Sequence, residues 1–106
     1  MEIIFSNEEL ETLYEGKKVK NKEFMSNPQL IKQFKKTVDK LRAVTRIEHL
    51  QQFTSLNYHK LKGDRIGHST VYVNKQYRII FSEIADENPP HEIRLLALEE
   101  LSKHYE

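Results

Sequence analysis

The last third of the chain contains three β-prone segments that follow one another through short polar links. Residues 68–74 and 77–84 are rich in β-branched and aromatic side chains, and residues 92–98 form a third run. The link between the first two segments, Asn74–Gln76, has the length of a hairpin connection. Strands joined by such links pair antiparallel, so the pattern predicts an antiparallel sheet, although residues 95–100 are also compatible with a helix.

Helical signals come earlier in the chain. Asn27 is a good helix cap and Pro28 suits the first helical position. The apolar residues that follow recur at helical spacing, at Leu30, Ile31, Phe34, Val38 and Leu41. Other elements expected before the strands are a strand at 2–5, a helix at 8–14, a loop at 17–27 and a short helix at 47–53. Helices followed by consecutive strands favour an α+β fold with the N-terminal helices packed on one face of a small antiparallel sheet.

Length and composition limit the kinds of protein that this chain can be. Its 106 residues are enough for one domain, spanning residues 1–106. The absence of cysteine excludes disulfides and thiolate metal sites, and His59, His68 and His91 lack metal-ligand spacing, so neither a metal nor another cofactor is predicted. The longest aliphatic run, residues 95–98, is far shorter than the roughly 20 residues that span a bilayer, and no signal peptide is visible. We therefore expect a cytoplasmic protein with no membrane association.

Positive charge is concentrated in the middle of the chain. Residues 17–78 carry fifteen Lys and Arg against four Asp and Glu, whereas residues 1–16 carry five acids and no base, and residues 79–106 carry seven acids and two bases. Such a local positive field favours a polyanion as partner. A lysine-rich face that is simply solvated explains the charge equally well.

Basic and polar residues also gather around the predicted strands. They are His59, Lys60, Lys62, Arg65, Lys75, Gln76, Tyr77 and Arg78. Arg78 lies within a strand between aromatic and aliphatic residues, where a guanidinium is costly to bury unless it binds an anion or a carboxylate. The pattern therefore indicates either an anion site or an internal ion pair with Glu83, Glu92 or Glu99.

Two stretches of this sequence resemble the HigB branch of the RelE/ParE toxin superfamily. Tyr58–Gly67 (YHKLKGDRIG) contains the branch's His-x-Leu-x-Gly-Asp-Arg-x-Gly pattern. Val71–Phe81 (VYVNKQYRIIF) has its strand, polar turn, aromatic–Arg pair and second strand. The resemblance implies a compact toxin with N-terminal helices on a curved antiparallel sheet, which cleaves messenger RNA in the ribosomal A site without a metal. It also implies a cognate helix-turn-helix antitoxin, and contact with operator DNA only through that antitoxin.

The resemblance further implies which residues form the site. The positions it associates with catalysis or phosphate contact are His59, Lys62 and Arg78. The branch tends to end in Asp-Tyr-His, and this chain departs from that pattern, so Glu99 or Glu100 is expected to replace the carboxylate. His104 and Tyr105 would supply the remaining groups, unless they belong to a frayed tail. The residues expected to bind RNA are Lys35, Lys36, Lys60, Arg65, Lys75 and Gln76.

Two other functions remain open at this point. The first is inhibition of DNA gyrase by binding alone, as in ParE-type proteins, although a histidine among cations at His59 and Lys62 argues against a pure binder. The second is an RNA-binding relic that has lost toxicity because of its altered C-terminus.

Overall fold

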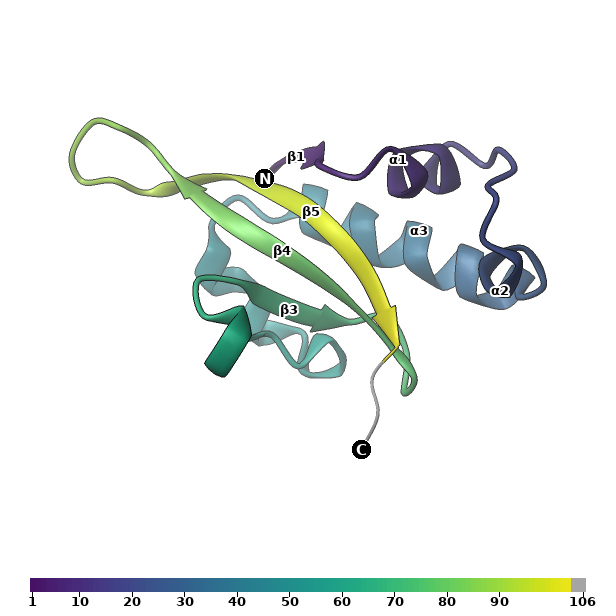
Figure 1. The fold of residues 1–106 in the computed structure, drawn as a ribbon. Helices are drawn as coiled ribbons and strands as arrows, with labels where there is room; N and C mark the ends of the chain where they lie inside the picture. The colour runs from purple at the N-terminus through teal and green to yellow at the C-terminus, as the bar shows by residue number, and fades with distance from the viewer. Residues whose placement is uncertain (104–106) are drawn as a thin grey trace.

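The structure, a computed structural model, describes residues 1–103 and combines helices with one sheet (Figure 1). The labels α, β and η denote α-helices, strands and 3-10 helices. In chain order the elements are β1 (Glu2–Phe5), α1 (Glu8–Tyr14), α2 (Lys22–Met25), α3 (Pro28–Ala43), η1 (Ile47–Gln52), η2 (Thr54–Leu56), β2 (His59–Lys60), η3 (Gly63–Arg65), β3 (Ser69–Tyr72), β4 (Tyr77–Ala85) and β5 (Ile93–Lys103). None of the helices in this part of the chain is long and apolar enough to cross a membrane.

The strands form a single five-stranded sheet in the order β1-β5-β4-β3-β2. Strands β2 to β5 pair antiparallel with their neighbours, as their short links predict. The first strand, β1, pairs parallel with β5, so the sheet is mixed and not wholly antiparallel. A parallel pair needs a long connection, and all the helices that the structure describes lie between β1 and β5 in the sequence. The α+β class with helices on one face of the sheet is confirmed.

Helix α3 is the longest helix of the described residues, and its apolar side chains enter the core beneath the sheet. Its N-terminus is capped by Asn27, whose side chain accepts a hydrogen bond of 3.1 Å from the backbone N–H of Leu30. The predicted apolar stripe is buried against core residues of β3, β4 and β5, namely Val71, Tyr77, Ile79, Phe81, Leu96, Leu98 and Leu101. One face of the sheet is therefore covered by α3, which lies behind the strands in Figure 1.

The structure corrects one local prediction and settles two others. The stretch 17–27, expected to be a loop, contains α2, a helix too short to show periodicity, whose Phe24 packs edge-on against Tyr77. The short helix expected at 47–53 is confirmed as the 3-10 helix η1. Residues 95–100, for which a strand and a helix were both possible, lie within strand β5, which pairs with β4 and, in part, with β1.

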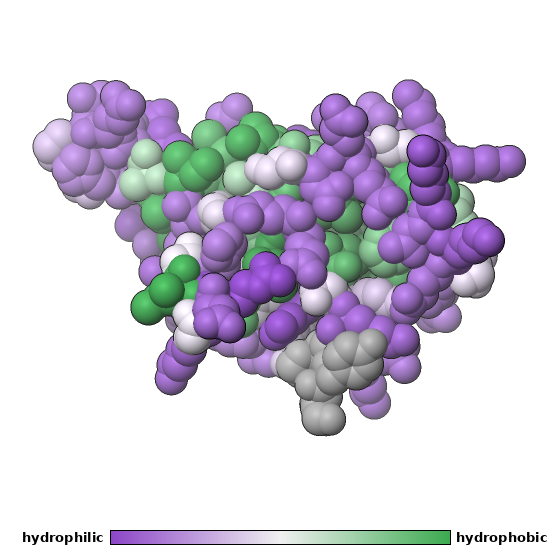
Figure 2. Space-filling view, viewed as in Figure 1, coloured by the Kyte–Doolittle hydropathy of each residue, from purple (hydrophilic) through white to green (hydrophobic). Residues whose placement is uncertain are grey.

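The opposite face of the sheet, which we call the open face, carries no helix of the α3 layer. Alternation along β4 directs Arg78, Ile80 and Ser82 to this face, while Ile79 and Phe81 enter the core. Figure 2 views the molecule from this side. Hydrophobic residues gather over β1 and the adjoining part of the β4–β5 pair, where Ile4 and Ile84 are exposed, and the region towards β3 is mainly hydrophilic.

Candidate functional site

Strand register brings three of the chemically active side chains together on the open face. His59 on β2 is the Cα partner of Thr70 on β3, and two residues further along β3 Tyr72 is the partner of Arg78 on β4. Directly paired residues of neighbouring strands point to the same face, as do residues two apart on one strand. His59, Tyr72 and Arg78 therefore share the open face, and Ser102 of β5 lies opposite Arg78.

The imidazole of His59 is held in one orientation by its own chain. Its Nδ1 atom lies 2.7 Å from the carbonyl oxygen of Asn57, and the ring makes a T-shaped contact with Tyr72 at 6.3 Å between ring centres. Because a carbonyl oxygen only accepts hydrogen bonds, Nδ1 must carry the hydrogen in this contact. The other nitrogen, Nε2, is then the acceptor in the neutral imidazole and is the atom available for proton transfer.

The carbonyl of Asn57 takes this position because of its backbone conformation. Asn57 has φ 45° and ψ 47°, the left-handed region that asparagine tolerates better than most residues. Beside it, Tyr58 donates a hydrogen bond of 2.5 Å to Glu83 and stacks on Phe81. Burial, together with the Glu83 carboxylate, raises the pKa of Tyr58. This neutral, anchored tyrosine fixes the start of β2, where His59 lies.

Arg78 is half-buried near the start of β4, directly after Tyr77. Its Nε atom is buried and has no hydrogen-bond partner among residues 1–103. Within the same part of the chain, none of the three carboxylates considered as its partners forms an ion pair with it. Glu83 accepts from Tyr58 and Ser69, and Glu99 interacts with His68 and Ser82. The guanidinium thus retains donors that an anion on the open face could accept.

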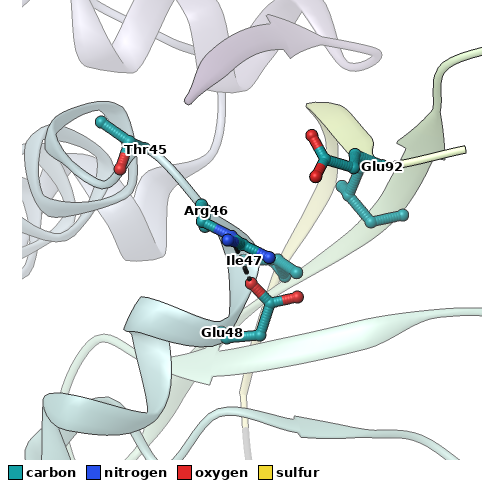
Figure 3. A pocket seen from close by; sticks show the side chains of 6 residues that line it. Thr45, Arg46, Ile47, Glu48 and Glu92 are labelled. Carbon is teal, nitrogen blue, oxygen red and sulfur yellow. Dashed lines mark hydrogen bonds and ion pairs between the residues drawn. The ribbon is translucent and has the colours of Figure 1, made fainter. Parts of the chain in front are cut away.

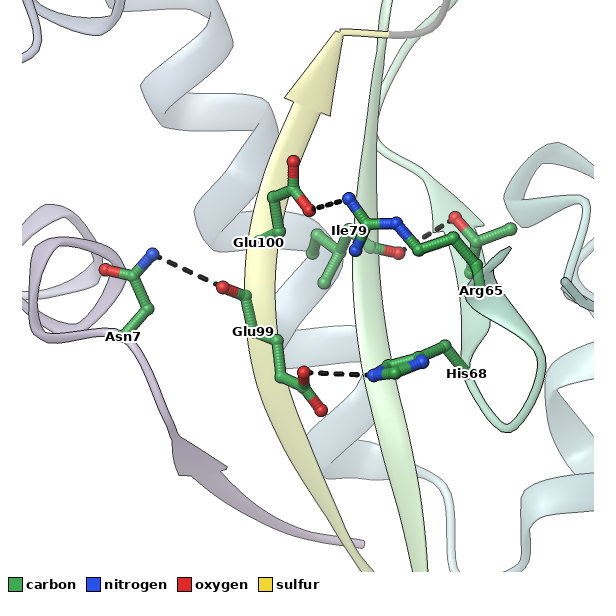
Figure 4. A network of polar contacts seen from close by, with 7 residues as sticks. Asn7, Arg65, His68, Ile79, Glu99 and Glu100 are labelled. Atoms are coloured by element: carbon green, nitrogen blue, oxygen red, sulfur yellow. Dashed lines mark hydrogen bonds and ion pairs between the residues drawn. The ribbon is translucent and has the colours of Figure 1, made fainter. Parts of the chain in front are cut away.

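Glu99 and Glu100 lie next to this site on β5, at a β-bulge (Figure 4). Ile80 pairs with Glu100 and Phe81 pairs with Leu98, so Glu99 is the extra residue of the bulge. The carboxylate of Glu99 lies 3.1 Å from Nε2 of His68 and accepts a hydrogen bond from Ser82. The Asn7 side chain donates a hydrogen bond of 3.3 Å to the backbone carbonyl of Glu99.

Glu100 is paired with one of the cations expected to bind RNA. Arg65 reaches from η3 across β4 and places Nη2 2.7 Å from the Glu100 carboxylate (Figure 4). Beneath this ion pair, Thr70 and Ile80 are fully buried although they lie on the open face. Arg65 is therefore at the predicted site, but its charge is partly neutralised there.

The remaining predicted cations divide between the two sides of the sheet. Lys62 is exposed at the start of η3, close in sequence to Arg65. Lys60 pairs with Ser69 and so points away from the face that carries His59. Lys35 and Lys36 lie on α3, in the layer that covers the other face, so the structure does not bring these three residues to the His59–Arg78 site.

Lys75 and Gln76 are exposed in the β3–β4 turn. The turn is organised by Asn74, whose Oδ1 accepts hydrogen bonds of 2.8 Å from the backbone N–H groups of Gln76 and Tyr77. A further bond of 2.8 Å joins Asn74 to Gln33 on α3. The two expected RNA contacts are therefore presented on a fixed turn at the end of the strand that carries Tyr72.

Two predicted site residues, His104 and Tyr105, lie outside the described residues. Conversely, the structure places two residues at the open-face site that the sequence did not predict there, Tyr72 and His68. Alternation along the strand separates Tyr72 from Val71 and Val73, but only the register of the hairpin shows that Tyr72 faces Arg78. His68 has no spacing signal, because its partner Glu99 lies 31 positions away.

A hollow lies away from the open-face site, between η1 and the start of β5 (Figure 3). Its lining includes Arg46, whose Nε lies 3.2 Å from Glu48, and a second carboxylate, Glu92. The one cation that lines it is already paired with an acid. This hollow therefore offers less to an anionic ligand than the surface around Arg78.

Comparison with known proteins gives a family and a fold. The family model described as the RelE-like toxin of type II toxin-antitoxin system HigB matches residues 3–89. Among solved structures, the YoeB/ParE toxin from Agrobacterium tumefaciens is similar over 99% of this chain and 100% of its own, with a TM-score of 0.53 and 13% identity, which shows a shared fold. A YoeB-YefM complex from Staphylococcus aureus aligns over 99% of this chain and 98% of its own, with a TM-score of 0.48 and 18% identity. No curated protein matches the chain.

Proposed function

The chain belongs to the HigB-like family of RelE-like toxins of type II toxin–antitoxin systems, and from this premise we propose that it is a ribosome-dependent endoribonuclease. In this proposal it cleaves messenger RNA in the ribosomal A site and so arrests translation. The observation that supports it best is the shared face of His59 and Arg78, which combines an oriented imidazole with a guanidinium whose Nε has no partner in the described part of the chain.

The proposed reaction is attack of a ribose 2′-oxygen on the adjacent phosphorus. Nε2 of His59 takes the proton of the 2′-hydroxyl as the new bond between the 2′-oxygen and phosphorus forms. The bond from phosphorus to the 5′-oxygen breaks, leaving a 2′,3′-cyclic phosphate on one fragment and a 5′-hydroxyl on the other. The planar guanidinium of Arg78 donates hydrogen bonds to the non-bridging oxygens and stabilises the charge that develops on them.

The other proposed roles follow from position. Lys62 adds positive charge near the phosphate, and Lys75 with Gln76 contacts the RNA beyond the end of β3. The leaving 5′-oxygen needs a proton, and His104 or Tyr105 is the proposed donor. Because Glu99 is held by His68 and Ser82, we assign it a positioning role for His68 instead of direct contact with the scissile phosphate.

A toxin of a type II system has an antitoxin as its partner. We propose that this antitoxin is a helix-turn-helix protein, that the complex binds operator DNA through it, and that the free toxin acts in the cytoplasm on messenger RNA held by the ribosome.

The test combines cleavage on translating ribosomes with transcript mapping in cells. Wild-type protein is expected to cut ribosome-bound message, and a His59→Ala, Arg78→Ala double variant of equal abundance is expected to leave it intact and to allow growth. Arg46→Ala is the matched control, because it removes a surface cation at the hollow near η1. Growth arrest by the wild-type protein with uncut transcripts and induced DNA damage would instead identify a gyrase inhibitor.

A further inference from the structure

Tyr72 stands between the two groups to which the proposed chemistry is assigned. It is the Cα partner of Arg78 and contacts the ring of His59 with an interplanar angle of 69°. Unlike Tyr58 and Tyr77, Tyr72 neither belongs to the hydrophobic core nor packs against it. Burial in the core therefore does not account for an aromatic side chain at this position.

The surface next to Tyr72 is hollowed. The hollow is lined by Tyr72 together with Ser55, Val73, Asn74 and Lys75. Asn74 is fixed by its bonds to Gln33 and to the turn, so the β3–β4 turn forms a rigid wall. One end of the hollow thus has an aromatic ring, and its rim carries the exposed ammonium group of Lys75.

This combination suits one nucleotide of a single-stranded RNA. Single-stranded RNA is bound by stacking of unstacked bases on aromatic side chains and by cations that follow the backbone. Directly paired residues have Cβ atoms only about 5 Å apart, so a phosphate on Arg78 places the neighbouring base at the Tyr72 ring.

We propose that Tyr72 is the base-stacking residue of this site, which holds the nucleobase next to the scissile phosphate and thereby sets the position of cleavage. The inference rests on the proposed function and extends it to a specific substrate contact. Every nucleobase has a π-face, so this contact fixes the register of the message on the protein and does not select one base. Lys75 binds the phosphate on the far side of the stacked nucleotide.

The experiment places 2-aminopurine, a base whose fluorescence falls on stacking, next to the cleavage position of a ribosome-bound message. A 2′-O-methyl group at that position prevents cleavage. The full-length protein is compared with Tyr72→Phe, which keeps the ring, and Tyr72→Leu, which keeps an apolar side chain without it. Cleavage of the same message without the modifications is measured in parallel, and thermal unfolding shows whether each variant is folded.

We expect wild-type protein and Tyr72→Phe to quench the fluorescence and to cut at one position. Tyr72→Leu is expected to lose the quenching, to cut about tenfold or more slowly, and to spread its cuts over neighbouring positions, since the base is then no longer held by stacking. Equal quenching and cleavage by Tyr72→Leu would overturn the inference and leave the proposed function intact, and a Tyr72→Phe variant as defective as Tyr72→Leu would overturn stacking as the cause. A wild-type protein that does not cut the message would overturn the proposed function, and the inference with it.

Discussion

Nδ1 of His59 lies 2.7 Å from the carbonyl oxygen of Asn57, two residues earlier in the chain. The left-handed backbone conformation of Asn57 points its carbonyl at His59. Because that carbonyl can only accept a hydrogen bond, the imidazole of His59 must carry its hydrogen on Nδ1. The atom left for proton transfer is then Nε2, on the side of the ring away from this bond.

This connection predicts different effects of two substitutions at Asn57. Asn57→Gly keeps both the backbone conformation and the carbonyl, and we expect nearly unchanged cleavage. A β-branched residue does not tolerate a φ of 45°, so Asn57→Val is expected to cost about 1–2 kcal/mol of stability and to slow cleavage by displacing the carbonyl from His59. Denaturant unfolding and ribosome-dependent cleavage measure the two effects. Equal cleavage by both variants would show that the Asn57 carbonyl does not orient the imidazole.

His59 itself is expected to contribute through proton transfer. His59→Ala should reduce the cleavage rate by about 10²–10⁴-fold, the usual contribution of a general acid or base. Stability should change little because the side chain is exposed. If His59→Ala does not fold, His59→Gln is used to test proton transfer. It retains a polar side chain of similar length and is expected to be equally inactive. Full activity of either folded variant would remove His59 from the mechanism.

The ion pair between Arg65 and Glu100 is expected to matter more for RNA binding than for stability. The two side chains are 46% and 39% exposed, so a double-mutant cycle should give a coupling of about 0.2–1 kcal/mol. Glu100→Gln removes a negative charge beside the open face and should strengthen binding of an uncleavable message, whereas Arg65→Ala should weaken it. Binding measured at two salt concentrations checks both signs. Equal weakening by the two variants would show that RNA needs the intact pair.

Tyr58 gives a prediction about alkaline stability. Its pKa is raised above 10.0 in the folded protein by burial and by Glu83, so the folded state holds the phenolic proton more tightly than the unfolded chain does. Its contribution is complete below about pH 10 and is lost as pH rises towards the folded pKa. Between pH 9 and about pH 11.5, wild-type protein should therefore lose more unfolding free energy than Tyr58→Phe. Parallel pH profiles for the two proteins would contradict this assignment.

Helix α3 packs into the hydrophobic core through Phe34. Phe34 is fully buried against the sheet, so Phe34→Ala should lower the free energy of unfolding by about 3–5 kcal/mol. Gln29→Ala, at an exposed position of the same helix, is the control and should change it by less than about 0.5 kcal/mol. Equal effects of the two substitutions in denaturant unfolding would mean that α3 does not form the core contact.

Much of the fold could be predicted because its signals are local. The cap at Asn27, the stripe from Leu30 to Leu41 and the short link at Asn74–Gln76 each depend on neighbouring residues. The parallel pairing of β1 with β5 could not be predicted, because it joins the two ends of the described chain and leaves no periodic signal. The helix α2 was missed because four residues contain little more than one turn.

The site was predicted only in part, because its geometry also depends on pairing between strands that are distant in the sequence. The sequence motif identified His59, Lys62 and Arg78 as candidates through resemblance, and the register of the sheet then placed His59 with Arg78. The same register places Tyr72 on the face that carries His59 and Arg78. Lys60 directly follows His59 on β2 and therefore points to the opposite face. The bulge at Glu99 decides which partners its carboxylate meets, and a bulge of this kind depends on pairing between strands that the sequence does not display.

The most direct test of the proposed chemistry is identification of the RNA ends produced on translating ribosomes. The proposed mechanism predicts fragments with a 2′,3′-cyclic phosphate at one end and a 5′-hydroxyl at the other, formed by the wild-type protein and by Arg46→Ala but not by the His59→Ala, Arg78→Ala double variant. Mass spectrometry of the fragments distinguishes these ends from those of hydrolysis by water, which leaves no cyclic phosphate. Uncut message in the presence of the wild-type protein, or the same ends produced at full rate by the folded double variant, would contradict the proposal that this open face breaks RNA.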